Sequence, residues 1–583
     1  MNGLQLGLRG AFLLSASWVL GDAAFQKMAE TMVHEQYQSQ PLAAVALGWH
    51  EYDGRFAVLD RSAVRNEIIR LKAADQTLDG VDGTKLNANE KRDFQLLDLQ
   101  LSQSRWRLST LQSAWRNPME YASLPDVSVY LIRDFAPLPD RIRFITRVLE
   151  RVPAHFTAAR QQLEPVLARP FVETAMEIAN GAAEFLSKDV AAEAAKVSDP
   201  AIKAGFQAAN QKAVSEFKGF AEWLRQERLP NAAAPFSIGI KAYAEMLANE
   251  LVGMTPDQVL ALGERELKAE QLRFIAAAKV IDPSKPAPEV FRAIQEEHPT
   301  EQTLIADTAR NLEAIREFIV RRDLVTIPSD VRARVEPTLP PFRSTSFASM
   351  STPGPFETKA TEAHYYVTPV EPDWPAAQKN EWLTAFNFYT TDVVSIHEAY
   401  PGHYVQFLAL NASQASTVAK VCTSYAFTEG WAHYCEQMLL DEGFGTEARP
   451  GESARDAQIR AAKYRLAQSS EALLRLCRLC ASVRMHCHGM TVDQATQFFV
   501  MNSYYEPKPA RAEARRGTHD PGYCFYTLGK LQLLKLRQDY KQQEGAAYSP
   551  KKFHDAVLAH GAPPVRILRE ILLRDPALWD KIL

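Results

Sequence analysis

Apolar residues recur at helical spacing over most of the chain. The segment AIKAGFQAANQKAVSEFKGFAEWLRQERL, residues 201–229, is one example, and it is rich in alanine, glutamine, glutamate and lysine. These residues favour helices, and the spacing of the apolar positions buries one helix face. Segments of this kind follow one another from about 25 to 325 and again from about 376 to the end. The pattern predicts a mainly α protein.

The stretch between these regions, about 326–375, has a different pattern. Prolines, serines and threonines accumulate there, and helical periodicity fails. Within it, AHYYVTPV at 363–370 has the aromatic and β-branched residues of a strand. We expect a small β insert in which this strand, with Tyr366, lies at an edge. An edge strand of this kind can pair with a further extended peptide segment through backbone hydrogen bonds.

No flexible linker separates these regions. We therefore predict one large domain, residues 25–583, that consists of two helical lobes and the insert. The helical lobe spans about 25–325, the β-containing insert about 326–375, and the metal-bearing helical lobe about 376–583.

The first 24 residues leave two interpretations open. They contain one arginine, a short apolar run interrupted by serines, and Ala23-Ala24. They form either a cleaved export signal or the first helix of the fold. The apolar run is shorter than the roughly 20 residues that a membrane span needs, so we expect no stable span. The chain is exported or periplasmic in the first case and cytoplasmic in the second.

Composition and charge limit the partners. The chain has 583 residues, a net charge of -4 and a pI near 6.4, and no long run of lysine and arginine. Nucleic acid is therefore excluded as an expected partner. Cys477, Cys480, Cys487 and His488 suggest a metal cluster, but they lie on one helical pattern, which is poor geometry for a tetrahedral site. Buried core thiols are the favoured interpretation.

The segment IHEAYPGHYVQ, residues 396–406, is similar to a zinc-binding helix with altered spacing. In H-E-x-x-H, histidines four residues apart share one helix face and the glutamate activates water. Here His397 and His403 are six apart, which on an ideal helix separates them by about 120° and about 9 Å. Zinc binds nitrogen at about 2.0 to 2.1 Å, so both rings reach one ion only if the helix is distorted.

Pro401-Gly402 can supply that distortion. Proline has no amide to bond the carbonyl of His397, its ring crowds that carbonyl, and Gly402 relaxes the backbone beside it. On this interpretation the pair is a two-residue insertion that brings His403 back towards His397. The alternative is that the helix ends at Tyr400 and the histidines are unrelated.

A third ligand is available in FTEGWAHYCEQML, residues 427–439. Glu429, His433 and Glu436 lie there on one helical pattern. Two histidines and a glutamate from a following helix make a catalytic zinc site with an open position for water. Glu429 and His433 are four residues apart, so they share a face of that helix.

Three segments resemble the signature segments of the bacterial domain-of-unknown-function 885 family: IHEAYPGHYVQ, TEGWAHYCEQ and RRGTHDPGYCFYTLGKLQLLKLR. That family is placed among the helical thermolysin-like (gluzincin-type) zinc peptidases, beside the angiotensin-converting-enzyme and thimet-oligopeptidase groups. The resemblance extends from about residue 30 to the C-terminus. It implies a large two-lobed helical metallopeptidase-like fold, a deep cleft, and one Zn²⁺ per chain.

The resemblance also implies roles for single residues. His397, His403 and Glu429 match the zinc ligands, and Glu398 matches the general base. His433 falls where many relatives carry an apolar residue, which favours a place behind the ligands or a packing role over a role as a ligand. Glu436 either holds a ligand histidine by its ring N–H or lies on a solvated face. His486 is a low-ranked substrate contact, since the preceding Ser482 replaces an acid of the relatives.

The late segment offers donors for the oxyanion that forms in peptide hydrolysis. Tyr526 best matches the tyrosine that precedes a glycine in the family, and Tyr523 and His519 are further candidates. Arg515 and Arg516 are candidates for gripping a substrate carboxylate. A solvated surface pair is the alternative for the two arginines, and packing is the alternative for the other three.

These observations favour a zinc-dependent hydrolase that cleaves peptide bonds of short peptides. Two alternatives stay open: a zinc hydrolase of non-peptide amides or esters, and a non-catalytic, metal-stabilised protein that binds peptides. The retention of Glu398 beside His397 favours an enzyme, because a structural metal site needs no uncoordinated carboxylate. Oligomeric state, cleavage direction and side-chain preference are open.

Overall fold

The computed structural model describes residues 23–339, 342–343 and 346–583. Helices account for 69% and strands for 3% of it, so the prediction of a mainly α protein with a small β insert is confirmed. The signal proposed for residues 1–24 lies, except for Ala23 and Ala24 at the start of α1, outside the described residues. Among the described residues, no helix combines the length and apolar character required to cross a bilayer.

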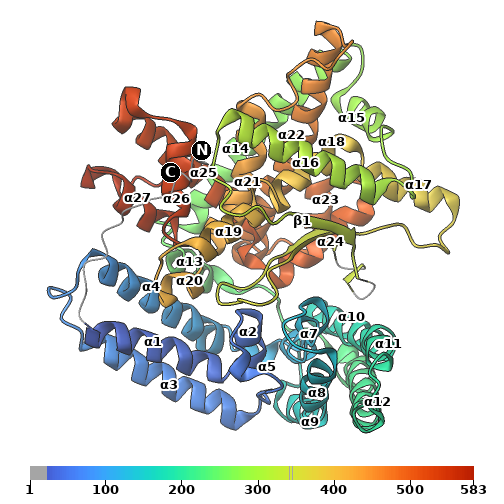
Figure 1. The fold of residues 1–583 in the computed structure, drawn as a ribbon, viewed down its shortest axis with the longest axis vertical. Helices are drawn as coiled ribbons and strands as arrows, with labels where there is room; N and C mark the ends of the chain where they lie inside the picture. Colours follow the sequence, from blue (N-terminus) through green and yellow to red (C-terminus); the bar gives the residue numbers. More distant parts are fainter. Residues whose placement is uncertain (1–22, 340–341, 344–345) are drawn as a thin grey trace, which may run out of the picture.

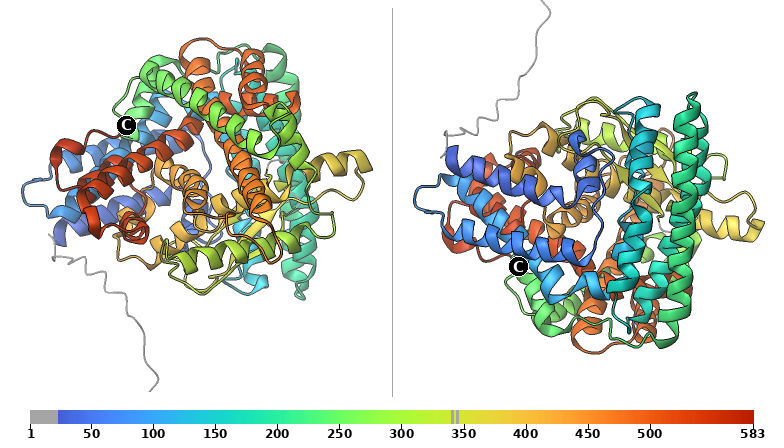
Figure 2. Two further views of the ribbon diagram at one scale, coloured as in Figure 1. Left: turned by 90° about the horizontal axis from the view of Figure 1, so that it is seen from above. Right: turned by 90° about the horizontal axis from the view of Figure 1, so that it is seen from below.

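The N-terminal helices form a layer of their own beneath the rest of the molecule (Figure 1), and the view from below shows their blue and cyan ribbons across that face (Figure 2). All of them except α5 contribute to one apolar core, whose members lie between Phe25 and Ala232, together with Ala360, Val418, Cys422 and Ile567 of the later chain. Their bounds are α1 (Ala23–Gln38), α2 (Pro41–Ala46), α3 (Arg61–Asp79), α4 (Ala88–Arg105), α5 (Ser113–Arg116), α6 (Met119–Ser123), α7 (Val129–Ile132), α8 (Leu138–Leu149), α9 (Val152–Gln162), α10 (Arg169–Phe185), α11 (Ala191–Ala195) and α12 (Pro200–Trp223).

The next four helices bury their apolar faces against the C-terminal half. They are α13 (Gly239–Asn249), α14 (Pro256–Ile281), α15 (Ala287–Gln295) and α16 (Leu304–Arg322). The first three share a core with the long helix α22 (Ala454–Cys487), and α16 shares one with the sheet. The cores therefore change near residue 232, and not near 325 where the helical pattern ends.

The remaining helices follow the sheet and carry most of the candidate site. They are α17 (Ala376–Ala385), α18 (Phe388–Glu398), α19 (His403–Ala412), α20 (Thr417–Val421), α21 (Tyr425–Asp441), α22, α23 (Val492–Ser503), α24 (Pro507–His519), α25 (Phe525–Glu544), α26 (Pro550–Leu558) and α27 (Val565–Leu572). Five of the six cysteines are buried, and Cys487 is half-buried. This agrees with core thiols, since Cys477, Cys480 and Cys487 all lie on α22.

The insert forms a three-stranded sheet in the order β1-β3-β2. Strand β3 (Ala363–Val367) is the predicted strand, and it pairs in parallel with β1 (Ala333–Pro337) and antiparallel with β2 (Ala348–Ser351). The prediction that it lies at an edge is therefore wrong. All five of its residues are buried, because both of its backbone edges and both of its faces are covered. The edge strands are β1 and β2.

Two glycines allow α21 and α25 to cross at close range. A Cβ on Gly529 would lie 1.7 Å from the carbonyl oxygen of Ala426, and one on Gly430 would lie 2.5 Å from the Cα of Gly529. Only glycine fits such backbone contact. The crossing brings Tyr526, at the start of α25, near Glu429 on α21.

Candidate metal centre

The helix that carries the first histidine is interrupted rather than bulged. Helix α18 ends at Glu398 and α19 begins at His403. Across the gap, the amide of Gly402 donates to the carbonyl of Ile396 at 3.0 Å, and the amide of Val405 donates to that of Ala399 at 3.4 Å. Both bonds span six residues instead of the four of an α-helix. The chain therefore absorbs two extra residues and resumes the helix.

The inserted residues are held by the helix that carries the third candidate ligand. The indole nitrogen of Trp431, on α21, donates to the carbonyl oxygen of Pro401 at 3.0 Å. Trp431 is fully buried, so this bond is shielded from water. Helix α18 therefore does end before Tyr400. The Pro401-Gly402 pair can still have its predicted role, which is to bring His403 back towards His397.

We expect Gly402→Ala to destabilise the chain by about 1 to 3 kcal/mol, the usual cost of overpacking, and to lower its metal content. The added Cβ would lie 1.8 Å from the carbonyl oxygen of His397, so the histidines must move apart. Urea unfolding and elemental analysis measure the two effects.

The matched control is Gly205→Ala on α12, where no atom lies within 4 Å of the added Cβ. It should be neutral or slightly stabilising, because alanine is the better helix residue. If Gly402→Ala were as stable as this control and kept its metal, the insertion would have no geometric role.

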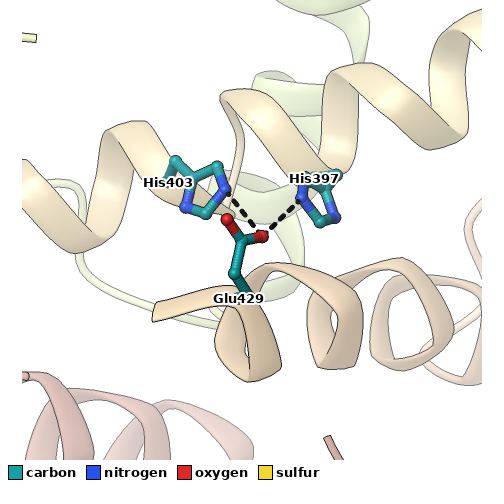
Figure 3. A group of neighbouring side chains, drawn as sticks. All are labelled: His397, His403 and Glu429. Atoms are coloured by element: carbon teal, nitrogen blue, oxygen red, sulfur yellow. Dashed lines mark ion pairs between the residues drawn. The ribbon is translucent and has the colours of Figure 1, made fainter. Parts of the chain in front are cut away.

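His397, His403 and Glu429 converge (Figure 3). Oε2 of Glu429 lies 3.4 Å from Nε2 of His397 and 3.5 Å from Nε2 of His403. The ring planes of the histidines stand at 89° with their centroids 4.9 Å apart. One potential ligand atom from each residue lies within 4.8 Å of the other two, the only such group found in the described part of the chain.

These separations fit a metal ion better than hydrogen bonds. A good N–H···O bond has a length of about 2.7 to 3.2 Å, and both contacts are longer. Around a tetrahedral ion with bonds of about 2.0 to 2.2 Å, two ligand atoms lie about 3.3 to 3.6 Å apart. Oε2 of Glu429 is buried and accepts no hydrogen bond within the described residues. Two imidazole nitrogens and one carboxylate oxygen are also a donor set that zinc prefers.

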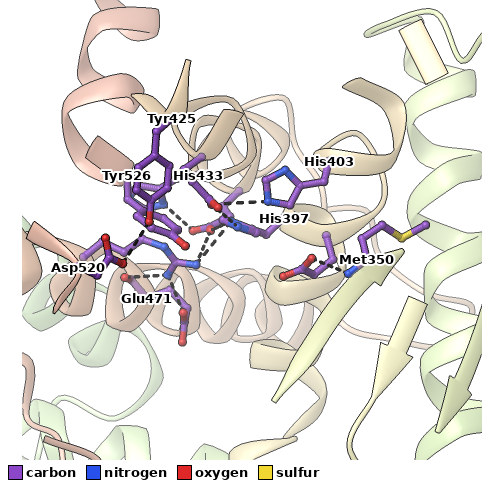
Figure 4. A network of polar contacts seen from close by, with 12 residues as sticks. Met350, His397, His403, Tyr425, His433, Glu471, Asp520 and Tyr526 are labelled. Atoms are coloured by element: carbon purple, nitrogen blue, oxygen red, sulfur yellow. Dashed lines mark hydrogen bonds and ion pairs between the residues drawn. The ribbon is translucent and has the colours of Figure 1, made fainter. Parts of the chain in front are cut away.

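Glu436 lies behind His397 and fixes the orientation of its ring; Figure 4 shows His397 and His433 in this network of polar contacts. Nδ1 of His397 donates to Oε1 of Glu436 at 2.8 Å, which directs Nε2 towards Glu429. Nδ1 of His433 donates to Oε2 at 2.9 Å, and Arg475 lies 3.2 Å from Oε1. Glu436 is fully buried, so it does not lie on a solvated face.

The charge of this carboxylate is stabilised by its surroundings. Burial favours the neutral acid, but the charge of Arg475 and the hydrogen bonds that both imidazoles donate hold the pKa of Glu436 well below its usual range. Burial lowers the pKa of His433 to about 3, so its ring is neutral. His433 faces Glu436 and is 1% exposed, which agrees with a position behind the ligands.

Glu398 follows the first histidine and points to the sheet. Its Oε2 accepts a hydrogen bond from the backbone N–H of Met350 at 3.1 Å, visible beside β2 in Figure 4. The amide of Thr368 donates to the carbonyl of Phe347. Hydrogen-bonded and non-bonded residues alternate along an antiparallel pair of strands, so Met350, three residues after Phe347, directs its N–H away from β3 to the outer edge of β2. Burial raises the pKa of Glu398.

Tyr526 lies on the other side of His397. Its ring is nearly parallel to that of His397, with centroids 6.3 Å apart. Its hydroxyl oxygen lies 3.4 Å from Nη2 of Arg516, which also bonds Asp520 at 2.9 Å. Of the three late candidates, Tyr526 is therefore the one that the structure brings beside the candidate ligands.

The other predicted contacts lie elsewhere. Tyr523 is fully buried, and its hydroxyl packs against Gly517. His519, at the end of α24, makes no hydrogen bond within the described residues, and burial lowers its pKa. Arg515 pairs with Glu177 of α10 at 2.9 Å, whereas Arg516 lies at the site.

The side chains of His486 and Tyr366 also make structural contacts away from the candidate site. His486 is 1% exposed, and its ring contacts the carbonyl of Gly517 at 2.7 Å. Tyr366 lies on the central strand and stacks on His364 with ring centroids 5.7 Å apart. Neither side chain contacts the three candidate ligands.

The sequence analysis missed two buried arginines. Arg475 and Arg478 of α22 lie with their guanidinium carbons 5.8 and 5.3 Å from the ring centre of Tyr526. Arg478 pairs with Glu513 at 2.7 Å. A signal for them exists, since two arginines interrupt an apolar stretch, EALLRLCRLC, and buried arginines need partners.

Residues 41–572 match the sequence family described as "Bacterial protein of unknown function (DUF885)". The chain belongs to this family. The DUF885 match includes the candidate ligands, Glu398 and Tyr526. The resemblance that the three signature segments indicate is thereby confirmed at the level of the family.

Two solved structures are similar to this DUF885 chain. One is described as a "putative lipoprotein of unknown function from Shewanella oneidensis"; it is 24% identical, with a TM-score of 0.77, over 95% of this chain and 100% of that one. The other, a "putative lipoprotein from Colwellia psychrerythraea", is 16% identical, with a TM-score of 0.78, over 97% and 100%. At these identities they show the fold alone. No curated protein matches the chain.

Proposed function

We propose that this protein is a zinc-dependent hydrolase that cleaves peptide bonds of short peptides. The observation that carries the proposal is the separation of 3.4 and 3.5 Å between one carboxylate oxygen of Glu429 and two imidazole nitrogens. The proposal includes a relationship of the fold to the helical thermolysin-like peptidases, as the sequence resemblance implies.

His397, His403 and Glu429 would hold the zinc ion. The chemistry that zinc supplies at such a site is polarisation of a carbonyl oxygen and a lower pKa for water. Three protein ligands leave one position of a tetrahedral ion for water or substrate, as in catalytic sites. Glu436, buried behind His397 and hydrogen-bonded to it, keeps the ring nitrogen directed at the ion.

Glu398 serves as the general base. It is adjacent to His397 in the chain but directs its carboxylate to the backbone of Met350 instead of to Glu429. That bond occupies Oε2, so Oε1 is available to accept a proton from the attacking water. The same carboxyl group later donates the proton to the leaving nitrogen.

Tyr526 donates a hydrogen bond to the oxyanion. Arg516 lies 3.4 Å from the hydroxyl oxygen and acts as a donor to it, which leaves the O–H proton of Tyr526 for the substrate. Arg475 and Arg478 also lie within 6 Å of the ring, and each of them is held in place by a carboxylate partner. Donors arranged in advance stabilise a developing negative charge.

The outer edge of β2 replaces β3 as the proposed docking edge for the peptide backbone. The outward N–H of Met350 already bonds Glu398, so a peptide added along this edge would pair with the neighbouring backbone groups of β2 and lie against the general base. Backbone pairing gives affinity without demanding particular side chains, which suits an enzyme that acts on varied short peptides.

A peptide-library digest tests the proposal. The zinc-loaded chain should release products that mass spectrometry detects, and the chelator-treated chain should release none until zinc is restored. Absence of any zinc-dependent product would overturn peptide hydrolysis. If products formed only from non-peptide amide or ester substrates, the protein would still be a hydrolase, but its substrate class would be different from the one proposed.

A further inference from the structure

A large cavity lies apart from the candidate metal centre. It measures about 1070 Å³ and is bounded by α4, the ends of α19 and α20, residues 326–330, and α26 with α27. In Figure 1, α26 and α27 lie above α4. Small-molecule pockets in proteins measure roughly 300 to 1,000 Å³, so the volume suffices for a ligand. No candidate ligand or catalytic residue lines this cavity.

Most of the wall of this cavity is apolar. Leu96 of α4, Ile327, and Ile567 and Ile571 of α27 contribute branched side chains, and Ala409 of α19 with Ala556 of α26 contribute small ones. An apolar wall of this kind binds hydrocarbon, because each buried methylene group gains free energy by leaving water.

Arg92 supplies a cation that forms no ion pair within the described residues. Its Nε donates to the carbonyl of Ala88 on the same helix at 3.1 Å, and its guanidinium forms no ion pair with any carboxylate of the described chain. Burial lowers the pKa of Arg92, and the charges of Asp93 and Glu570 raise it by a smaller amount. A half-buried guanidinium with free N–H groups in a cavity is a binding site for an anionic oxygen.

His560 lies close enough to Arg92 to be affected by its charge. Burial and the charge of Arg92 together lower the pKa of His560 to about 4, so the ring is neutral. Within the described residues its nitrogens make no hydrogen bond, and both residues line the cavity. The neutral ring therefore offers one N–H within the cavity that Arg92 also lines.

Three acidic residues line the cavity: Asp93 and Asp555 already accept hydrogen bonds, and the third, Asp330, is exposed and lies 4.0 Å from Arg316. Oδ1 of Asp93 accepts from Ser416 at 2.7 Å, and Asp555 accepts from the amide and hydroxyl of Thr326 at 2.8 and 2.7 Å. Their presence disfavours a ligand with several negative charges, such as a phosphate ester, by repulsion. One carboxylate fits the single unpaired cation.

We propose that this cavity binds a small amphipathic monocarboxylate, whose carboxylate contacts Arg92 and His560 and whose hydrocarbon chain lies on the apolar wall. The proposal does not depend on the hydrolase, because the two sites share no residue.

Isothermal titration calorimetry of the full chain tests it with three probes: octanoate, decanoate and octanamide. Octanoate should bind once per chain, and octanamide at least about tenfold more weakly, since it cannot form a charge-assisted hydrogen bond. Decanoate should bind roughly tenfold more tightly than octanoate because of its two extra methylene groups. No octanoate binding, or equal affinity for the carboxylate and the amide, would overturn the proposal.

Variants locate the binding. Arg92→Gln should lower octanoate affinity about tenfold without affecting octanamide, and Ala556→Phe, which fills the cavity, should weaken both. Lys91→Gln is the matched control, because Lys91 is an exposed neighbour on α4 outside the cavity. Circular dichroism checks that each variant folds. Octanoate affinity unchanged in Ala556→Phe would place the binding elsewhere and refute this site.

Discussion

Glu398→Gln is expected to lower peptide turnover at least about a hundredfold while zinc content and thermal stability stay near those of the parent chain. Lost general-base assistance typically costs about 10² to 10⁴ in rate. The amide oxygen of glutamine can still accept the hydrogen bond of Met350, so the contact with β2 survives. The carboxylate is not among the three converging ligands, so the metal should remain. Steady-state kinetics on a peptide from the digest, with elemental analysis, measure both effects.

Two outcomes would contradict this interpretation of Glu398. Loss of zinc in the variant would make Glu398 a ligand, and full activity would place the chemistry elsewhere. Glu381→Gln is a suitable control. Glu381 is exposed on α17, and its substitution removes one negative charge without touching the candidate ligands.

His403→Ala is expected to remove most of the zinc from a chain that otherwise holds about one ion. His397 and Glu429 would remain, and two ligands bind zinc weakly. Zinc content after dialysis against a weak chelator is the measurement, and circular dichroism shows whether the fold persists. Activity should fall with the metal and should not return when zinc is added at the parent's working concentration.

The control for this experiment is His488→Ala. His488 is partly exposed at the end of α22 and lies 3.0 Å from Asp257, away from the three ligands. It should keep its zinc. Full zinc occupancy in His403→Ala would remove His403 from the site and restore the alternative in which the two histidines are unrelated.

Local sequence determined the helices and most of the candidate ligand set. Helical periodicity depends on which residues lie three and four positions apart, and this information is local. The same holds for His397, Glu398 and His403, whose spacing raised the question of a metal. The helix N-caps are local too: the side chain of Asn387 accepts from the amide of Thr390 at the start of α18.

Tertiary structure decided how the interruption after Glu398 is used. From the sequence, a bulged helix and a broken helix were both open, because Pro401 permits either. The bond from Trp431 to the carbonyl of Pro401 joins residues 30 positions apart and orients the break. Such a contact depends on the packing of α21 against α18, which no periodicity encodes.

The polar partners of the site were likewise decided by packing. Glu436 had two open interpretations, and its burial against His397, His433 and Arg475 selected one of them. Arg515 and Arg516 are neighbours in the chain, but successive helix residues point about 100° apart, so one meets Glu177 and the other Tyr526.

The sheet marks the limit of what the sequence by itself determined. Its aromatic and β-branched residues identified β3 as a strand, but strand order depends on pairing with segments about 15 to 30 residues away, and the central position of β3 followed only from the fold. The contact between Met350 and Glu398, 48 residues apart, arose in the same way. The sequence thus determined which residue types were available for chemistry, and the tertiary structure decided which of them meet, because side chains distant in the chain are brought together only by packing.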